Sequence, residues 1–216
     1  MPHGFRVAVG VFVVFFALPI RAVPPTPERM QELCAQVEGP SHCGRVVEAE
    51  QLKSLPSLAV RDGDTLKVSL FPSGTRDFVD TISSSNEHTF ALWDYWSPVN
   101  AVVLFTTAGD ELGYAVLQRT TGQLTVLPAE PLLAPDRQRV ATADFCPTRC
   151  TGEITVWRMS REGLRRELGW KPPAGWSDVT VAWKDADTLT IQYTAPGEEK
   201  SRTQERKLAA TDWKKF

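Results

Sequence analysis

Three aromatic side chains fall within one five-residue run, Leu92-Trp93-Asp94-Tyr95-Trp96, and these residue types are suited to hold a ligand. Trp and Tyr are enriched at the anchors of binding surfaces, and their rings also stack on sugars. In a regular strand, Leu92, Asp94 and Trp96 would face one way, and Trp93 and Tyr95 the other. The run makes Trp93, Tyr95 and Trp96 the candidate binding residues. The interpretation that the sequence favours is that all three rings pack in the core, where large aromatics usually lie.

Serine hydrolysis is the first catalytic class to consider, because Ser83, Ser84, Ser85 and His88 lie close together in the sequence. A catalytic triad needs a serine beside a histidine that a carboxylate orients, and adjacency in sequence does not provide that geometry. The chain has no Gly-x-Ser-x-Gly nucleophile motif. The segment has the composition of a polar loop, so we predict no catalytic residue in it.

Paired acids that could bind a hard cation occur in three places: Asp62 with Asp64, Asp110 with Glu111, and Asp185 with Asp187. A calcium loop needs more oxygen ligands at fixed spacing, and none of these pairs extends that far. All three pairs lie in predicted turns, where Asp is favoured because its side chain bonds to the backbone. We therefore predict no metal site and no cofactor. Two carboxylates for glycoside cleavage need only meet in space, and the sequence singles out no such pair.

The four cysteines form an even set, which an oxidising compartment would pair. Three connectivities are possible, and the spacing favours two local bridges, Cys34 with Cys43 and Cys146 with Cys150. The competing interpretation of the second pair is a redox or metal motif. Thioredoxin-type pairs have two intervening residues rather than three, and zinc would need further ligands from a chain that is poor in histidine. Structural disulfides are the prediction.

The N-terminal segment has the pattern of a secretory signal peptide. Arg6 precedes an uncharged apolar run from Val7 to Leu18, and the small residue Ala22 follows. The run is shorter than the roughly 20 residues of a membrane-spanning helix, although an uncleaved anchor is the alternative. The first cysteine is Cys34, which argues against a bacterial lipid anchor. We expect residues 1–22 to be a signal peptide and the protein to be periplasmic or secreted.

Length and charge set further limits. The 216 residues carry a formal net charge of −2, which gives no reason to expect nucleic acid or an anionic membrane as partner. After removal of the signal, the chain suits one domain with a core and has no second hydrophobic span. We expect the partner to be another envelope or extracellular protein.

Residues 23–56 predict a short helical hairpin. Thr26 is suited to be an N-cap, and Pro27 to be the first helical residue. An apolar stripe follows at helical spacing: Met30, Leu33, Cys34 and Val37. Ser41 is the predicted cap of a second helix, which ends before Pro56. The first disulfide would pin the two helices, and we expect the pair to dock on the β domain.

Residues 57–216 predict a β domain, because the periodicity changes to 2. Thr65–Leu70 and Thr188–Thr194 alternate apolar and polar residues, as half-buried strands do. Val102–Phe105 is uniformly apolar, which indicates a strand that is covered on both faces. Short strands between Gly or Asp turns indicate an antiparallel sandwich, barrel or propeller.

An internal repeat favours the last of these architectures. The segment 114–119 leads through Gly122 to a further strand, and 154–159 leads through Gly163 in the same way, 40 positions later. Each is followed by a proline-containing link and another hairpin, at 133–143 and 181–193. A period in the forties is typical of one four-stranded propeller blade.

Leu133-Ala134-Pro135-Asp136-Arg137-Gln138-Arg139-Val140-Ala141 resembles the Ser-Pro-Asp-Gly-Lys-x-Ile-Ala strand–turn–strand of bacterial exported propeller repeats, the Tol-type and WD-repeat-like blades. Trp96 to Val103 is a looser copy. Ala134 replaces the serine, Arg137, followed by Gln138, stands where glycine is usual, and the Trp-Asp signature is missing from these segments. The resemblance implies two to three propeller-like blades, with a β-sandwich as the alternative, and it transfers no functional residue.

These observations predict an exported, non-catalytic binding or scaffolding protein of the bacterial cell envelope. The missing catalytic motifs and a β architecture that presents loops support this interpretation. A cell-envelope hydrolase, with acids near the aromatic run acting on a glycan or peptide, is the alternative from another class. A third possibility is an inhibitor that inserts the loop 83–88 into the active site of such an enzyme.

Overall fold

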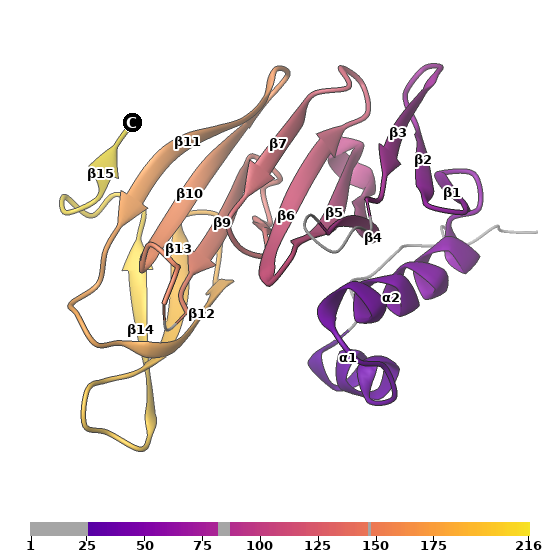
Figure 1. Ribbon diagram of the computed structural model, residues 1–216. Helices are drawn as coiled ribbons and strands as arrows, with labels where there is room; N and C mark the ends of the chain where they lie inside the picture. Colours follow the sequence, from indigo (N-terminus) through magenta and orange to yellow (C-terminus); the bar gives the residue numbers. More distant parts are fainter. Residues whose placement is uncertain (1–25, 82–86, 147) are drawn as a thin grey trace, which may run out of the picture.

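The computed structural model describes residues 26–81, 87–146 and 148–216. Two helices come first, and antiparallel strands follow them (Figure 1). The predicted mainly β class with an N-terminal pair of helices is confirmed. The predicted signal peptide and Ser83, Ser84 and Ser85 lie outside the described residues. In the described part of the chain, no helix is long and apolar enough to cross a membrane.

Helix α1 (Pro27–Cys34) begins as predicted, because the Thr26 hydroxyl accepts a hydrogen bond from the Arg29 amide at 3.3 Å. Helix α2 (Pro40–Ser54) begins earlier than predicted. Its N-cap is Gly39, at a φ of +82°, and no side chain caps it, so the predicted cap at Ser41 is wrong. The physical reason is that Pro40 is preset for the first helical turn, which already contains Ser41. The predicted Cys34–Cys43 disulfide joins the helices.

The strands form four antiparallel sheets, and apart from β15 each sheet is a run of consecutive strands. The first sheet contains β1 (Ala59–Asp62), β2 (Thr65–Ser69) and β3 (Thr75–Val79). The second contains β4 (His88–Trp96), the short helix η1 (Ser97–Val99), β5 (Ala101–Ala108), β6 (Glu111–Gln118) and β7 (Leu124–Leu127). The third contains β8 (Leu132–Leu133), β9 (Arg139–Asp144), β10 (Glu153–Ser160), β11 (Gly163–Trp170) and β15 (Lys214–Lys215). The fourth contains β12 (Ser177–Trp183), β13 (Thr188–Thr194) and β14 (Ser201–Lys207).

The sheets pack against one another in chain order (Figure 1). Three hydrophobic clusters lie between neighbouring sheets: one between the first and second, one between the second and third, and one between the third and fourth. The position of strand β5 between two clusters explains why its sequence is uniformly apolar. Val102 and Leu104 belong to the first of these clusters, whereas Val103 and Phe105 belong to the second. The prediction that this segment is covered on both faces is confirmed.

The two outer sheets bury only one face each. In the fourth sheet, the unpacked face carries Thr180, Ala182, Gln192, Thr203 and Glu205, all exposed. In the first sheet, Leu66 and Val68 are buried while their strand neighbours are partly exposed. This alternation ends the stack at both sides, because a mostly polar face offers little apolar area to bury, although Val60 and Val79 are exposed on the outer face of the first sheet. No ladder of described strands joins one sheet to the next, so these strands form no closed barrel. The outer face of the fourth sheet is exposed and does not pack on the first sheet, so the described sheets do not close into a propeller either.

The internal repeat corresponds to equivalent strands. The repeated segments are the third and fourth strands of the second sheet, β6 and β7, and of the third sheet, β10 and β11. The hairpins that follow them supply the first two strands of the third and fourth sheets. The 40-residue period therefore marks one sheet of the stack.

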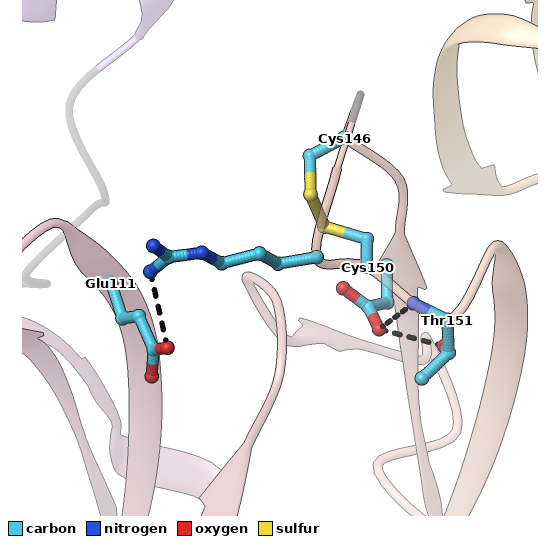
Figure 2. Close-up of a disulfide and its surroundings, with 6 residues drawn as sticks. Glu111, Cys146, Cys150 and Thr151 are labelled. Carbon is cyan, nitrogen blue, oxygen red and sulfur yellow. Dashed lines mark hydrogen bonds and ion pairs between the residues drawn. A yellow bond between two sulfur atoms is a disulfide. The ribbon is translucent and has the colours of Figure 1, made fainter.

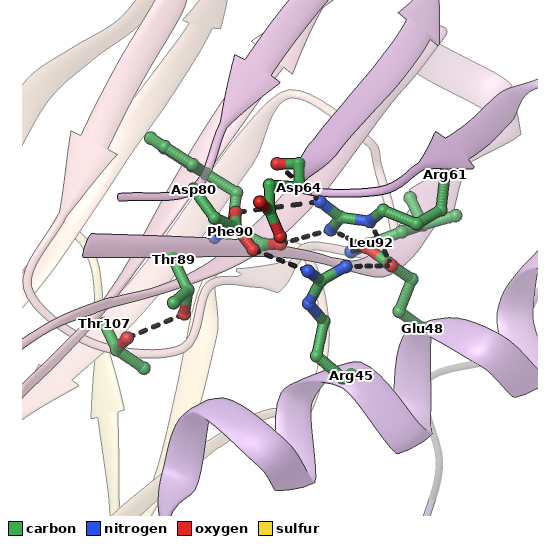
Figure 3. A network of polar contacts seen from close by, with 9 residues as sticks. All are labelled: Arg45, Glu48, Arg61, Asp64, Asp80, Thr89, Phe90, Leu92 and Thr107. Atoms are coloured by element: carbon green, nitrogen blue, oxygen red, sulfur yellow. Dashed lines mark hydrogen bonds and ion pairs between the residues drawn. The ribbon is translucent and has the colours of Figure 1, made fainter. Parts of the chain in front are cut away.

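Helix α2 packs on the second sheet through close contact and through buried ion pairs. A Cβ atom at Gly44 would lie 2.9 Å from the Phe105 ring, so glycine permits the approach. Farther along the helix, Glu48 receives both arms of the Arg61 guanidinium, at 2.8 and 2.6 Å, and the Leu92 amide at 2.9 Å (Figure 3). The network joins α2, β1 and β4.

A second acid completes this network (Figure 3). Asp80, whose side chain is fully buried, accepts from the Phe90 amide at 2.9 Å and lies 2.8 Å from the Arg45 guanidinium. Arg61 also reaches the Asp80 carboxylate at 3.6 Å and donates to the Phe90 carbonyl at 2.6 Å. Two arginines thus face two buried acids, as burial of charge requires.

Candidate functional site

The aromatic run of β4 does not alternate as a regular strand. Leu92 pairs with Leu104 and Asp94 with Val103, so one residue is inserted at Trp93. Such a β-bulge places two residues opposite one and shifts the facing of the strand. Trp93 and Trp96 therefore share the cluster between the second and third sheets. The prediction that Trp93 faces away from Trp96 is wrong, because a bulge cannot be read from periodicity.

Tyr95 lies on the opposite face of β4, beside the cluster of the first two sheets. Its hydroxyl donates to the Asn100 side chain at 3.1 Å and lies 3.2 Å from the Arg119 guanidinium. The same guanidinium packs over the Tyr95 ring, 5.6 Å from its centroid. The structure therefore separates Tyr95 from the two tryptophans with which the sequence grouped it.

Trp93 and Trp96 line a cavity of about 470 Å³. This volume lies within the range of small-ligand pockets. The cavity lies where β4 meets β8 of the third sheet and β12 of the fourth. Its described lining consists of three tryptophans, two acids and otherwise apolar residues: Trp93, Asp94, Trp96, Val103, Glu130, Pro131, Leu132, Leu133, Pro135, Val181, Ala182 and Trp183. Two of the three predicted binding residues thus meet at one hollow.

Two of the three tryptophans of the cavity donate their indole N–H groups to the protein. Trp93 donates to the Glu130 carboxylate at 2.9 Å, and Trp183 donates to the Leu132 carbonyl at 2.8 Å. The Trp96 indole lies beside the Asp94 carboxyl and lowers its pKa. Trp93 and Trp96 are only 6 % and 7 % exposed, so a small part of each ring contributes to the wall of the cavity.

Asp94 is the buried acid of the cavity, with only 5 % of its surface exposed. Burial raises the pKa of this carboxyl to about 6, and the negative charge of Glu130 adds to the rise. Hydrogen bonds from the Tyr95 amide, at 2.6 Å, and from Trp96 oppose the rise, but they are the smaller effect. Asp94 is therefore an acid that keeps or releases its proton near neutral pH.

Two residues of the cavity have no signal in the sequence. Glu130 stands in a proline-containing link after β7, where an acid is ordinary. Trp183 ends a strand that alternates regularly, so its position predicts a partly buried core residue. Only the packing of three sheets brings both residues to β4.

A second, larger hollow of about 840 Å³ lies between the second and third sheets, beside the Cys146–Cys150 disulfide. That bridge confirms the predicted pairing. At this hollow the Arg149 guanidinium donates to the Glu111 carboxylate at 3.3 Å. Figure 2 shows Glu111 and the disulfide. The Thr151 amide and hydroxyl both donate to the carboxylate of Asp144, at 2.9 and 2.7 Å. These four polar residues of the hollow thus pair with one another.

The aromatic wall of this second hollow adjoins the first cavity. Tyr114 packs edge-on against Trp93, with ring centroids 5.6 Å apart. Burial and the charge of Glu130 raise the pKa of the Tyr114 hydroxyl, so this group stays neutral at physiological pH. Glu130 lines both hollows.

Two of the other residues that the sequence singled out, His88 and Asp185, have contacts within the fold. The His88 ring packs edge-on against Phe90, with centroids 4.4 Å apart. In the turn between β12 and β13, Asp185 accepts from the Asp187 amide at 2.8 Å, as turn acids do. Within the described ranges, no group of three or more His, Cys, Asp or Glu side chains is placed to hold a metal ion.

Comparison with protein-family models, with curated proteins and with solved structures found no match.

Proposed function

We propose that this chain is an exported binding protein that holds one small group of its ligand or partner in the tryptophan-lined cavity. The observation that carries the proposal is the meeting of three tryptophans and a buried acid at one hollow of suitable volume. Ligand sites are mostly apolar and aromatic and contain a few placed polar groups. The cavity matches that composition.

Export is supported by the two disulfides, because such bridges persist in oxidising compartments. A periplasmic or secreted location therefore agrees with the cysteine pairing. The predicted partner, another envelope or extracellular protein, would present the group that enters the cavity. The cavity lies at a strand edge, where β8 and β12 end their sheets, and a partner can approach from that side.

We also propose that the sheets are blade-like units of an open stack, as the resemblance to exported propeller repeats implies. Support comes from the 40-residue period and from the meander order of the strands. In this arrangement the cavity collects the first strands of three successive units, β4, β8 and β12. Binding sites where several units meet are a common use of such folds.

A thermal-shift screen tests the binding proposal. A ligand that occupies the folded protein alone raises its Tm, so a panel of organic cations, sugars and short peptides should contain a stabilising compound. The Trp183→Leu variant should lose that shift, because it removes one wall of the cavity. Trp176→Leu is the matched control, since Trp176 is also partly buried against the third cluster but does not line the cavity. An equal shift in wild type and Trp183→Leu would exclude the cavity as the site.

A hydrolase is the second candidate, and the raised pKa of Asp94 beside Glu130 favours it. Glycoside cleavage uses one carboxyl that keeps its proton and a second that stays ionised. If the protein is such an enzyme, Asp94→Asn should abolish release of reducing ends from cell-wall glycan while ligand binding persists. If the wild-type protein binds the glycan but does not cleave it, the hydrolase candidate is wrong and the binding proposal stands.

A further inference from the structure

The two acids of the cavity have no cationic partner in the described part of the chain. Neither Asp94 nor Glu130 forms an ion pair there, although many other acids do. The cavity lining contains no Lys, Arg or His. A buried carboxylate without a counter-charge is costly, and the raised pKa of Asp94 reflects that cost. The hollow is therefore a region of uncompensated negative charge.

The described lining also offers few side-chain donors. Two of its three indole N–H groups bond to Glu130 and Leu132, and the third, of Trp96, lies beside the Asp94 carboxyl. The other side chains of the described lining are aliphatic or proline, apart from the two carboxylates. Its polar groups thus accept hydrogen bonds and carry negative charge. An anion would be repelled, and a sugar would find acceptors but few side-chain donors for its own oxygens.

We infer that the cavity takes an organic ammonium group, free or carried on a partner's side chain. The inference rests on the proposed function and specifies its ligand. A cation over the faces of several tryptophans is attracted by the ring quadrupoles, and quaternary ammonium groups are recognised in this way. Asp94 and Glu130 supply the opposite charge, and the aliphatic residues contact the carbon atoms of the ligand. Tryptophan side chains in the lining, two acids and the scarcity of side-chain donors all favour the same chemistry.

The decisive comparison uses two ligands of one shape. Choline carries a trimethylammonium group, and 3,3-dimethyl-1-butanol replaces its nitrogen by carbon without charge. Titration followed by the fluorescence of the buried tryptophans should give an affinity at least about tenfold higher for choline. Equal affinities would overturn the cation inference and leave the binding proposal intact, because the cavity would then recognise shape alone. Failure of both compounds, with binding of a sugar or an anion at the cavity, would also overturn it.

Charge removal provides a second readout that does not depend on folding. Glu130 is exposed, so Glu130→Gln keeps an acceptor for the Trp93 indole and should leave the Tm nearly unchanged. Choline affinity should fall about three- to tenfold, and affinity for the neutral isostere should not. The matched control is Glu162→Gln, which removes the same charge from the exposed β10–β11 turn. Equal losses of choline affinity in the two variants would mean that the net charge of the protein causes the effect. That result would contradict a binding site at the cavity.

The source of the ammonium group is decided by a third titration. A free cation and a lysine side chain of a partner share this chemistry, so choline is compared with a peptide that carries one central lysine. Binding of choline alone indicates a free methylated ammonium ligand, and tighter binding of the peptide indicates a protein partner. If Glu130→Gln changes the affinity for neither compound, the ammonium inference is wrong.

Discussion

Two pairs of acids lie along strand β4, and they differ in whether arginines pair with them. Near the start of the strand, Glu48 and Asp80 lie against Arg45 and Arg61 and accept amide hydrogen bonds (Figure 3). Near its end, Asp94 and the exposed Glu130 face tryptophans and no cation in the described chain. The first pair joins helix to sheets, whereas the second is exposed to a cavity.

The difference separates a structural site from the site that we propose for binding. A buried charge is tolerated when it is paired and hydrogen-bonded, which describes the first pair. An unpaired buried acid opposes folding and persists only where something else requires it. Asp94 is such an unpaired buried acid. The bulge in β4 brings it to the cavity together with Trp93 and Trp96. Variants that remove a charge or an aromatic ring at these sites test this distinction.

The largest expected effect comes from breaking the paired site. Arg61→Met should lower the free energy of unfolding by about 3–5 kcal/mol, because it removes both guanidinium bonds to the buried Glu48 and leaves only the longer contact with Arg45, at 3.5 Å. Urea unfolding of the two proteins measures the difference. The control is Arg29→Met, which removes exposed pairs with Glu32 and Glu50 and should cost less than about 1 kcal/mol. Similar costs for both variants would show that the network contributes no more than a surface pair.

The walls of the unpaired site should be almost as important for stability. Trp93 and Trp96 are only 6 % and 7 % exposed, so Trp93→Ala and Trp96→Ala should each cost about 3–5 kcal/mol. Regular alternation predicted a sharp difference between the two positions, and the bulge removes the basis for it. Thermal unfolding of both variants measures the costs. A much smaller loss for either tryptophan would place its ring outside the core.

Removing the charge of the unpaired site should stabilise the protein, with a pH dependence. The pKa of Asp94 rises from an ordinary 3.8 to about 6, so the folded state holds its proton more tightly than the unfolded chain does. Its contribution to stability therefore falls as the pH rises from 3.8 to about 6 and stays lost above that range. Asp94→Asn should raise the free energy of unfolding by about 2–3 kcal/mol at neutral pH.

This gain should disappear below the unfolded pKa, where both proteins carry a neutral side chain at position 94. Denaturation curves across the pH range test the sign. A variant that is less stable than wild type at neutral pH would mean that hydrogen bonds to the carboxylate outweigh its desolvation. The charge of Glu130 adds to the raised pKa of Asp94, so the measurement is repeated in Glu130→Gln to isolate the contribution of Asp94.

The smallest effect is expected at the rim of the second hollow. Glu111 and Arg149 form an ion pair, but both side chains are about two-thirds exposed. Glu111→Gln should change the stability by less than about 1 kcal/mol, and high salt should remove even that difference. A cost that approaches that of Arg61→Met would show that burial does not distinguish the two kinds of pair.

Local patterns in the sequence were sufficient for much of the fold. The Thr26 cap, both disulfides and the alternating strands were predicted because each depends on neighbours within a few residues. The uniformly apolar segment of β5 also predicted its own burial on two faces. The wrong cap at Ser41 came from a proline that starts the helix earlier.

The candidate site depended on the tertiary structure at every step. The run from residue 92 to 96 identified Trp93 and Trp96, but the inserted residue in the ladder decided which way they face. Glu130 and Trp183 reach the cavity only because three sheets meet there. Periodicity describes one strand at a time, whereas a cavity depends on distances between strands that are far apart in sequence. The sequence by itself therefore determined the elements and the disulfides, and the packing of the sheets decided which acids find a partner and which do not.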